Sequence, residues 1–444
     1  MEELNPLRLR RSLSFLTRDV LTLFLISFVV NLGFSCISPI FPFYVLALKG
    51  LIHKVPELEL TIHAEQASIE FGVLMASFML TRAPMAAVSG HLSDMLGRRK
   101  VIILGLLIYS LAAVAYLFCT SVAYLIAIRA SQGVASAMVW PVAEALLSDL
   151  VKRFERGRAM SIYVSLMNFA NIFGPSLGTV AYKLYVSSVD NPDLFTALRM
   201  PIILLAATSF IGLAASLRLP ETKAAGTSGS RRSGEIRATM HALKGKVKRS
   251  LNTIYFNGVI NGFSMGIIQT AFIIFVINEV SKDPSTIGLL FSVSGIVSIL
   301  SSITAGHISD KLRERKTSIL LSYLVSRPLL FFAPFVKDVG TLLLLFSLWS
   351  LAFGISMPLM RALQADLISS EIRGTVFGFQ QTFFNSGMVV GALSGGYLCG
   401  ILTRKRFSFL GLTFSGLAIP FFIAAGLGVF TTVLFGLYVS EKAE

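Results

Sequence analysis

Long apolar stretches separated by short polar loops run through the whole chain. Each stretch holds about 20 residues or more, the length that a helix needs to cross the hydrocarbon core of a bilayer. The pattern predicts twelve membrane-spanning helices in two sets of six. The first set covers residues 20–48, 68–90, 101–118, 121–149, 158–186 and 195–219. The second set covers residues 251–279, 285–306, 317–336, 340–367, 374–401 and 407–439.

A polar, basic stretch separates the two sets. Residues 220–250 contain glycine and serine and end on a cluster of lysine and arginine. Such a cluster favours a position against anionic lipid on the cytoplasmic side. We therefore expect an N-terminal six-helix bundle at 1–219, a cytoplasmic basic linker at 220–250 and a C-terminal six-helix bundle at 251–444.

The composition agrees with a membrane protein and excludes a soluble one. Of the 444 residues, 54% are apolar and 14% are charged, against about 25% charged residues in soluble domains. The net charge of +15 could indicate nucleic-acid binding, but the basic residues gather in alternate loops. This distribution obeys the positive-inside rule and places both termini in the cytoplasm. We expect a multi-pass, monomeric protein of the cell membrane with no nucleic-acid partner.

One basic cluster departs from this rule. Arg404, Lys405 and Arg406 fall on the predicted outer side, between the last two spans. Either the rule is overridden locally, or the boundaries of the last two helices are shifted.

The two sets of spans are related by an internal repeat. Three pairs of residues match at a constant offset of 217: Pro141 with Pro358, Gly174 with Gly391, and Gly178 with Gly395. Parallel halves related by an axis along the membrane normal produce such a repeat.

A short basic loop joins the second and third predicted spans. It reads Gly90-His91-Leu92-Ser93-Asp94-Met95-Leu96-Gly97-Arg98-Arg99-Lys100, and a related copy runs from Gly306 to Lys316. Glycine permits a tight turn, and the basic residues hold the loop at the cytoplasmic surface. The loop resembles the signature Gly-x-Leu-x-Asp-x-x-Gly-Arg-Arg/Lys of the major facilitator superfamily. The resemblance implies an all-α membrane fold of twelve helices in two pseudo-symmetric six-helix bundles.

The resemblance also assigns roles within this loop. It implies that Asp94 contacts the N-terminal end of the eleventh helix and that Arg98 forms an ion pair with Asp149. Together with Gly90 and Gly97, these residues would form an inner latch that holds the cytoplasmic side shut in the outward-open state.

The second copy of the loop departs from the first. It keeps the glycine and the aspartate, but alignment at an offset of 216 places Glu314 at the position of Arg98. We therefore expect the N-terminal half alone to carry the latch.

The fourth span carries an arginine that needs a partner, since a lipid-facing guanidinium is costly. The segment Arg129-Ala130-Ser131-Gln132-Gly133 resembles the Arg-x-x-Gln-Gly element that the superfamily associates with proton transfer. Arg129 either perturbs a nearby carboxyl group or contacts substrate. Alternatively, it pairs with backbone carbonyls and polar groups and serves packing.

Glu144 is the carboxylate that lies well inside a predicted span, and the repeat places Arg361 at the matching position of the tenth helix. In one hypothesis, Glu144 carries the transported proton and releases it when Arg361 approaches. In another, the two residues form an inner gate. The third alternative is that Glu144 pairs permanently with Arg82 or Arg129 and only stabilises the bundle.

The fifth span contains Gly174-Pro175-Ser176-Leu177-Gly178, which resembles the Gly-Pro-x-x-Gly element of the superfamily's antiporters. Glycine permits close helix approach, and proline bends a helix. The element therefore favours export. The alternative is that Gly174, Pro175 and Gly178 belong only to a close-packed helix pair.

Polar and aromatic residues in the spans complete the candidate substrate cavity, although amide side chains can equally join helices to one another. These candidates are Asn31, Trp140, Asn168, Asn171, Asn257, Asn261, Gln269 and Asn385. Arg82, about 18 Å from the inner end by helix rise, is either a partner of Glu144 or a binding group for an anionic substrate.

The sequence has no Gly-x-x-x-x-Gly-Lys-Ser/Thr loop and no His-Glu-x-x-His or paired-cysteine spacing, so we expect neither an enzyme nor a cofactor or metal. The resemblance to the drug:proton antiporter branch predicts a secondary active transporter that exports amphipathic or hydrophobic small molecules by alternating access, coupled to protons. The alternative is a proton-coupled symporter or uniporter of an organic anion or sugar, because Arg82, Arg129 and Arg361 outnumber Glu144. A receptor or scaffold without transport is the third class.

Overall fold

The computed structural model describes residues 15–59, 61–152, 155–222, 245–312, 315–368, 372–409 and 412–440. The chain folds into two compact units. The first consists of Met1–Phe41 and Ser77–Ala225, and the second of Pro42–Ala76 and Gly226–Glu444. Most of the predicted linker, residues 223–244, lies outside the described residues, so the division of the chain at 220–250 stays a prediction.

The regular elements described in the first unit are helices. Its helices are α2 (Arg18–Cys36), the later part of α4 (Ser68–Leu96), α5 (Arg98–Leu117), α6 (Val122–Leu150), α7 (Arg156–Ser188) and α8 (Leu194–Ser216). Side-chain caps start three of them, α2, α6 and α8: Thr17 accepts a hydrogen bond from Val20 N, Ser121 from Tyr124 N, and Asp193 from Thr196 N. The core contains Tyr109 and Trp140, whose ring centroids lie 6.4 Å apart.

The second unit begins with short elements and continues with six long helices. The short elements are α3 (Phe41–Leu48), η1 (Pro56–Leu58) and η2 (Ala64–Ala67), followed by the early part of α4. The long helices are α10 (Gly245–Phe275), α11 (Pro284–Leu312), α12 (Arg315–Phe332), α13 (Val339–Leu367), α14 (Arg373–Leu402) and α15 (Ile419–Tyr438). Between them lie the π-helical turn η3 (Val276–Val280), η4 (Ala333–Phe335), the strands β1 (Arg406–Phe409) and β2 (Leu412–Ser415), and η5 (Gly416–Ala418).

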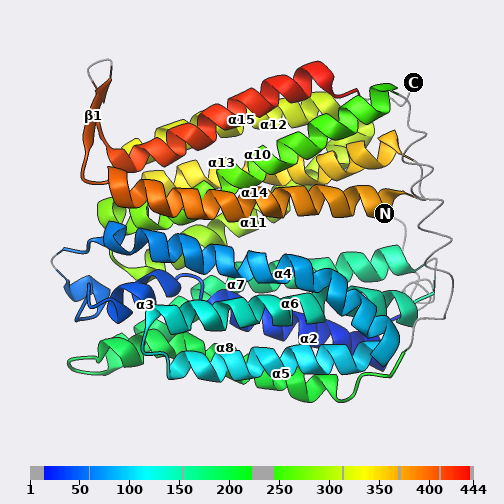
Figure 1. Ribbon diagram of the computed structural model, residues 1–444, viewed down its shortest axis with the longest axis horizontal. Coiled ribbons are helices and arrows are strands. Elements are labelled where there is room, and N and C mark those ends of the chain that lie inside the picture. Colours follow the sequence, from blue (N-terminus) through cyan, green and yellow to red (C-terminus); the bar gives the residue numbers. More distant parts are fainter. Residues whose placement is uncertain are drawn as a thin grey trace, which may run out of the picture. The chain divides into compact units, whose positions relative to one another are not determined.

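Equivalent helices pack in the same pairs in the two units. In the first, α2 packs on α7 and α8, and α5 packs on α6 and α8. In the second, α10 packs on α14 and α15, and α12 packs on α13 and α15, and Figure 1 shows α10, α14 and α15 side by side. The internal repeat read from the sequence therefore corresponds to one helix arrangement built twice.

The first and last predicted spans have different boundaries in the structure. The span predicted at 20–48 is two helices, because Pro39 between α2 and α3 lacks the N–H that a continuous helix requires. The span predicted at 407–439 was placed too early, since its first residues form an antiparallel hairpin in which Phe407 pairs with Phe414. The hairpin projects beyond α14 and α15 (Figure 1). Arg404, Lys405 and Arg406 thus lie at the start of a hairpin, and the last helix starts at Ile419.

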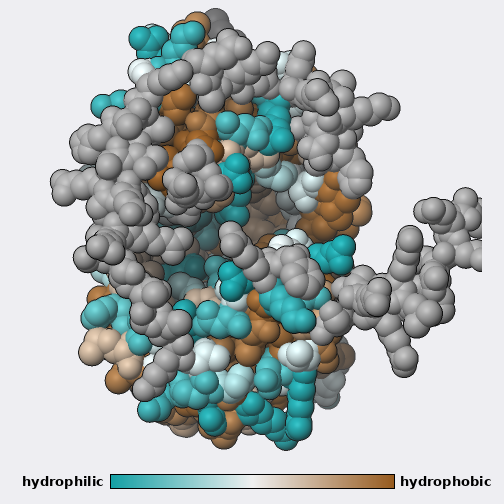
Figure 2. All heavy atoms as spheres, turned by 90° about the vertical axis from the view of Figure 1, so that its right-hand side faces the viewer, coloured by the Kyte–Doolittle hydropathy of each residue, from teal (hydrophilic) through white to brown (hydrophobic). Residues whose placement is uncertain are grey.

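The surfaces of the helices are those of a membrane protein. Eleven helices of the described part are long and apolar enough to cross a bilayer. The fifth predicted span, α7, is not among them, since its 33 residues include several polar ones. Large apolar side chains are exposed along the helices, for example Leu111 at 58% and Leu344 at 62%. Figure 2 shows hydrophilic residues exposed at one end of the helices, next to hydrophobic ones.

The loop after α3 is bound to the second unit by hydrogen bonds. Ala64 N donates to Asn278 Oδ1 at 3.0 Å, and Asn278 Nδ2 donates to Glu65 Oε2 at 2.9 Å. Lys282 Nζ donates to the backbone carbonyl of Glu59 at 2.9 Å. The loop is thus held at the π-helical turn that ends the first long helix of this unit.

Candidate functional site

The predicted latch lies at the turn between α4 and α5. Gly97 adopts a φ of +99°, a conformation that residues with a Cβ rarely tolerate, whereas Gly90 lies within α4. The turn places Arg98 at the first position of α5. Glycine at position 97 is therefore required by the backbone of this turn.

Arg98 lies against both carboxylates that the sequence assigned to the latch. Its Nε donates to Asp149 Oδ2 at the end of α6, and its Nη1 lies 3.8 Å from Asp94 Oδ1. All three residues belong to the first unit, so these contacts join α4, α5 and α6 to one another. The predicted contact of Asp94 with the eleventh helix would reach the other unit and stays a prediction.

The second unit contains an ion pair equivalent to that of Arg98 and Asp149, and whether the latch works on one side alone stays a prediction. Arg315 Nη1 lies 3.0 Å from Asp366 Oδ2, which joins the start of α12 to the end of α13. Both residues match Arg98 and Asp149 at the offset of 217, not 216. The second copy of the loop has one residue more between its aspartate and its arginine than the first, so alignment from the start of the loop places Glu314, which lies outside the described residues, at the position of Arg98.

Arg129 is buried in an aromatic cage. Its guanidinium carbon lies 4.7, 4.9 and 4.8 Å from the ring centroids of Phe34, Phe41 and Phe78. Its Nη1 donates to Gln132 Oε1 at 3.0 Å, and its Nε has no hydrogen-bond partner among the described residues. None of these contacts is with a carboxylate, so the charge is held by ring faces and an amide.

Three further charged residues of the candidate site lie on different surfaces. Glu144 is exposed on α6, and Arg361 is exposed on α13 of the other unit. Arg82 is half-buried on α4, with its guanidinium carbon 5.9 Å from the ring centroid of Phe78. The described contacts of Arg129 and Arg82 are with a glutamine side chain and phenylalanine rings, and a permanent ion pair with Glu144 stays a prediction.

The antiporter-like element on α7 packs directly on α2. A Cβ at Gly178 would meet the backbone carbonyl of Cys36, and one at Gly174 would meet Ser35 and Leu32. The element therefore joins two helices of the first unit at backbone distance. The same relationship occurs in the second unit, where a Cβ at Gly391 of α14 would meet the carbonyl of Phe263 on α10.

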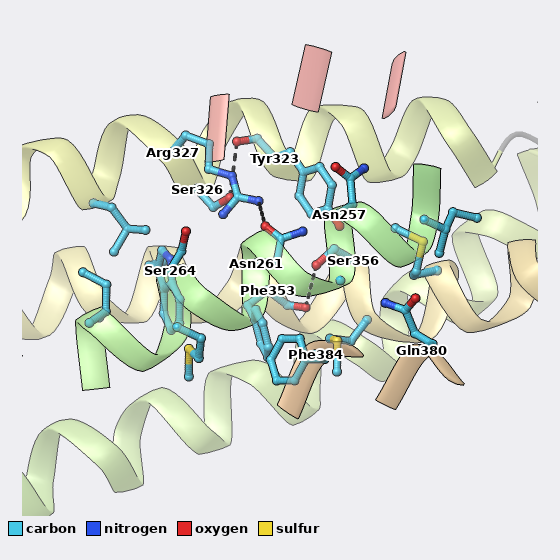
Figure 3. A pocket seen from close by; sticks show the side chains of 18 residues that line it. Asn257, Asn261, Ser264, Tyr323, Ser326, Arg327, Phe353, Ser356, Gln380 and Phe384 are labelled. Carbon is cyan, nitrogen blue, oxygen red and sulfur yellow. Dashed lines mark hydrogen bonds between the residues drawn. The ribbon is translucent and has the colours of Figure 1, made fainter. Parts of the chain in front are cut away.

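A pocket opens inside the second unit, among α10, α12, α13 and α14 (Figure 3). Its polar lining residues are Asn257, Asn261, Ser264, Tyr323, Ser326, Arg327, Ser356 and Gln380. Its aromatic and sulfur-containing lining residues include Trp349, Phe353, Phe384, Met265, Met357 and Met360. The pocket thus combines one cationic side chain with amides, hydroxyl groups and an apolar wall, which is the mixture that small-molecule sites use.

The predicted cavity residues divide between this pocket and other places. Asn257 and Asn261 line the pocket. In the first unit, Asn31 donates to Ser27 O at 2.8 Å, and Asn171 accepts from Ser35 Oγ at 2.7 Å. The remaining candidates lie elsewhere: Trp140 in the core of the first unit, Asn168 and Gln269 on exposed helix surfaces, and Asn385 in a hydrogen bond with Gln381.

Arg327 is the functional candidate that we did not select from the sequence. It lies inside the predicted span 317–336, where a charged side chain costs free energy unless it has a partner or a function. The sequence therefore already marked Arg327 as a candidate. The described residues contain no group of three or more histidine, cysteine, aspartate or glutamate side chains that could hold a metal ion.

The chain matches known proteins along almost its whole length. The sequence model of the Major Facilitator Superfamily matches residues 23–252 and 254–444. Multidrug resistance protein 2 of Bacillus subtilis (strain 168) is 26% identical over 390 residues, which are 86% of this chain and 89% of that protein. Quinolone resistance protein NorA of Staphylococcus aureus (strain COL) is 21% identical over 406 residues, 91% of this chain and 96% of that protein.

A solved structure shares the fold. The inward-facing and occupied structure of a bacterial homolog of the human lysosomal transporter Spinster is similar with a TM-score of 0.72 and 15% sequence identity. The match covers 94% of this chain and 96% of that chain. At this identity the similarity concerns the fold alone.

Proposed function

The chain belongs to the major facilitator superfamily, and from this premise we propose that it exports amphipathic or hydrophobic small molecules in exchange for protons, by alternating access. Family membership makes it a multi-pass membrane transporter and not an enzyme. The proposal includes the direction of transport, the proton coupling, the location in the cell membrane, the cytoplasmic termini and the monomeric state.

The observation that carries the proposal of export is the similarity to proteins named for drug resistance. Both relatives are matched over more than four fifths of either chain, so the similarity includes both halves of the transporter. The packing of Gly174 and Gly178 on α2 supports the same function, because α7 carries the element that resembles antiporters.

Proton coupling is proposed to depend on Glu144. This carboxylate is exposed on α6, which supports a role in proton exchange. Arg361 is exposed at the matching position of α13, so the two side chains can attract one another when the halves close. This arrangement serves either a proton carrier or an inner gate, and transport measurements on a Glu144 variant separate the two.

A second candidate function is proton-coupled symport, or uniport, of an organic anion or sugar. The observation that favours it is the chemistry of Arg129, whose buried guanidinium contacts amide and aromatic groups but no carboxylate. A buried positive charge of this kind attracts an anionic ligand.

The proposed function is tested first by binding and then by exchange. Purified protein is screened by thermal shift against cationic drugs, organic anions and sugars, and each stabilising compound is tested for counterflow in liposomes that contain the protein. A transporter exchanges internal unlabelled compound for external labelled compound. Stabilising compounds that show no counterflow would instead indicate a receptor or scaffold.

A further inference from the structure

Arg327 is a cation without an anionic partner in the pocket of the second unit. Among the described residues that line the pocket, no other side chain is charged. Arg327 Nη2 donates to Asn261 Oδ1 at 2.8 Å, and the guanidinium carbon lies 4.8 Å from the ring centroid of Tyr323 (Figure 3). Its Nε is buried and has no hydrogen-bond partner within the described chain. The guanidinium, which lines the pocket, therefore retains unused hydrogen-bonding capacity.

Other buried polar atoms around the pocket also have no hydrogen-bond partner among the described residues. They are Nδ2 and Oδ1 of Asn257, Oγ of Ser264 and Oε1 of Gln380. Buried polar groups are almost always paired, because an unpaired one retains the cost of its lost hydration. Several such atoms around one arginine indicate a place where water or a polar ligand supplies the missing bonds.

The neighbouring helix leaves room for the guanidinium. A Cβ at Gly428 of α15 would lie 2.5 Å from Arg327 Cδ and 2.6 Å from its Nε. Any larger residue at position 428 would displace the arginine. The position of the charge is therefore set by α15 as well as by the hydrogen bond to Asn261 on α10.

The rest of the pocket is suited to an apolar body. Trp349, Phe353 and Phe384 line it together with methionines, whose flexible side chains adapt to ligands of different shape. The pocket volume of about 100 Å³ is several times the roughly 10–15 Å³ that a single water molecule requires. It therefore admits a ligand group of several atoms.

We propose that this pocket binds an amphipathic carboxylate, with the carboxylate on Arg327 and the apolar body against Trp349, Phe353 and Phe384. Arginine presents paired N–H groups that match the two oxygens of a carboxylate. The inference rests on the proposed function in one respect: it names the charge of the molecule that is transported. The binding itself is measurable without transport.

The test uses the two tryptophans of the chain. Trp140 lies in the first unit and Trp349 lines the pocket, so the Trp140→Phe protein reports on the pocket through Trp349 alone. The probes are 4-(4-nitrophenyl)butyrate and 4-(4-nitrophenyl)butylammonium, which share a quenching nitrophenyl body and differ in charge. We expect saturable quenching by the carboxylate at lower concentration than by the ammonium.

Two variants in this background remove or displace the charge. Arg327→Gln is expected to weaken carboxylate binding by about 10- to 100-fold, the range for loss of a charged hydrogen bond, and to leave ammonium binding unchanged or stronger. Gly428→Ala keeps the charge but displaces the guanidinium, and it is expected to weaken carboxylate binding as well. Arg404→Gln, the same substitution at an exposed site after α14, is the matched control and should bind as the parent does.

The outcomes separate this inference from the proposed function. Equal affinity for the two probes, no quenching by the carboxylate, or full carboxylate affinity in well-folded Arg327→Gln protein would overturn the inference. If Arg327→Gln does not fold, full carboxylate affinity in Gly428→Ala would do the same. If the carboxylate binds but shows no counterflow, the proposed binding site is supported and the proposed transport function is contradicted.

Discussion

Arg315 on α12 and Asp366 on α13 form the same ion pair in the second unit that Arg98 and Asp149 form in the first. The nitrogen and oxygen atoms of Arg315 and Asp366 lie 3.0 Å apart. Each pair joins the start of the third helix to the end of the fourth helix of its unit. The two units therefore share the ionic contact at this end as well as their helix packing.

The first prediction concerns these two ion pairs. Arg98→Asp is expected to lower the transport rate strongly, and addition of Asp149→Arg should restore part of it, because the reversed pair has the same attraction. Arg315→Asp with Asp366→Arg should behave in the same way. Each single change should also lower the free energy of unfolding, and Arg98→Asp more than Arg315→Asp, because position 98 is less exposed and lies beside two carboxylates.

Initial transport rates and melting temperatures, measured on the same preparations, check this prediction. Failure of both double variants to recover transport would show that the side chains act separately and not as pairs. If Arg315→Asp keeps full transport activity while Arg98→Asp loses it, the latch is carried by the N-terminal half alone.

The second prediction concerns the contact between α7 and α2. Gly178→Ala is expected to destabilise the protein by about 1–3 kcal/mol, because the new methyl group meets the backbone carbonyl of Cys36, which cannot rotate away. Gly157→Ala on the same helix has open space at its Cβ and is the matched control. Thermal unfolding in detergent should show a lower melting temperature for Gly178→Ala only, and equal values for both variants would contradict the close contact.

The third prediction concerns proton coupling. Glu144→Gln is expected to abolish transport driven by a proton gradient and to leave counterflow intact, because the amide cannot carry a proton. Asp190→Asn, which changes an exposed carboxylate beyond the end of α7, should retain both activities. If Glu144→Gln retains its response to the gradient, the proton is carried elsewhere, and the residue is left with a gating role.

The fourth prediction concerns the loop that follows α3. Glu59 Oε1 accepts hydrogen bonds from His53 N at 2.7 Å and Lys54 N at 2.8 Å, and these bonds lower the pKa of Glu59 below its ordinary value of 4.5. The folded loop therefore favours the ionised carboxylate. This stabilisation is present above pH 4.5 and is lost as the pH falls through the lowered pKa.

Glu59→Gln should accordingly lower the melting temperature slightly at pH 7, and the difference from the parent should shrink toward pH 3.5. Thermal unfolding at both pH values measures it. A difference of the same size at both pH values would mean that the charge of Glu59 does not stabilise the loop.

Much of the architecture could be predicted because membrane helices leave long apolar stretches in the sequence. The spans from α4 to α14 lie close to their predicted positions for this reason. The last span could not be placed correctly, since the hairpin around Phe407 and Phe414 also contains large apolar residues and leads directly into the apolar helix. Hydropathy alone does not separate these two structures.

The candidate site was less predictable because its contacts cross between helices. The pairing of Arg98 with Asp149 follows a family signature, but its counterpart at Arg315 was missed because the second copy has one additional residue between Asp310 and Arg315. Arg327 was passed over because its significance depends on Asn261 and Gly428, which belong to two other helices. No periodicity within one helix reports such a grouping.

Proton-driven export is the central claim, and flux in everted membrane vesicles tests it most directly. The vesicles contain the protein, and a compound found by the binding screen is placed either inside them or in the external solution. A pH gradient is then imposed in one direction or the other. An exporter that exchanges its substrate for protons should accumulate external compound when the vesicle interior is acidic, and Glu144→Gln vesicles should not. Accumulation only when the exterior is acidic, or at the same rate without a gradient, would contradict proton-coupled export.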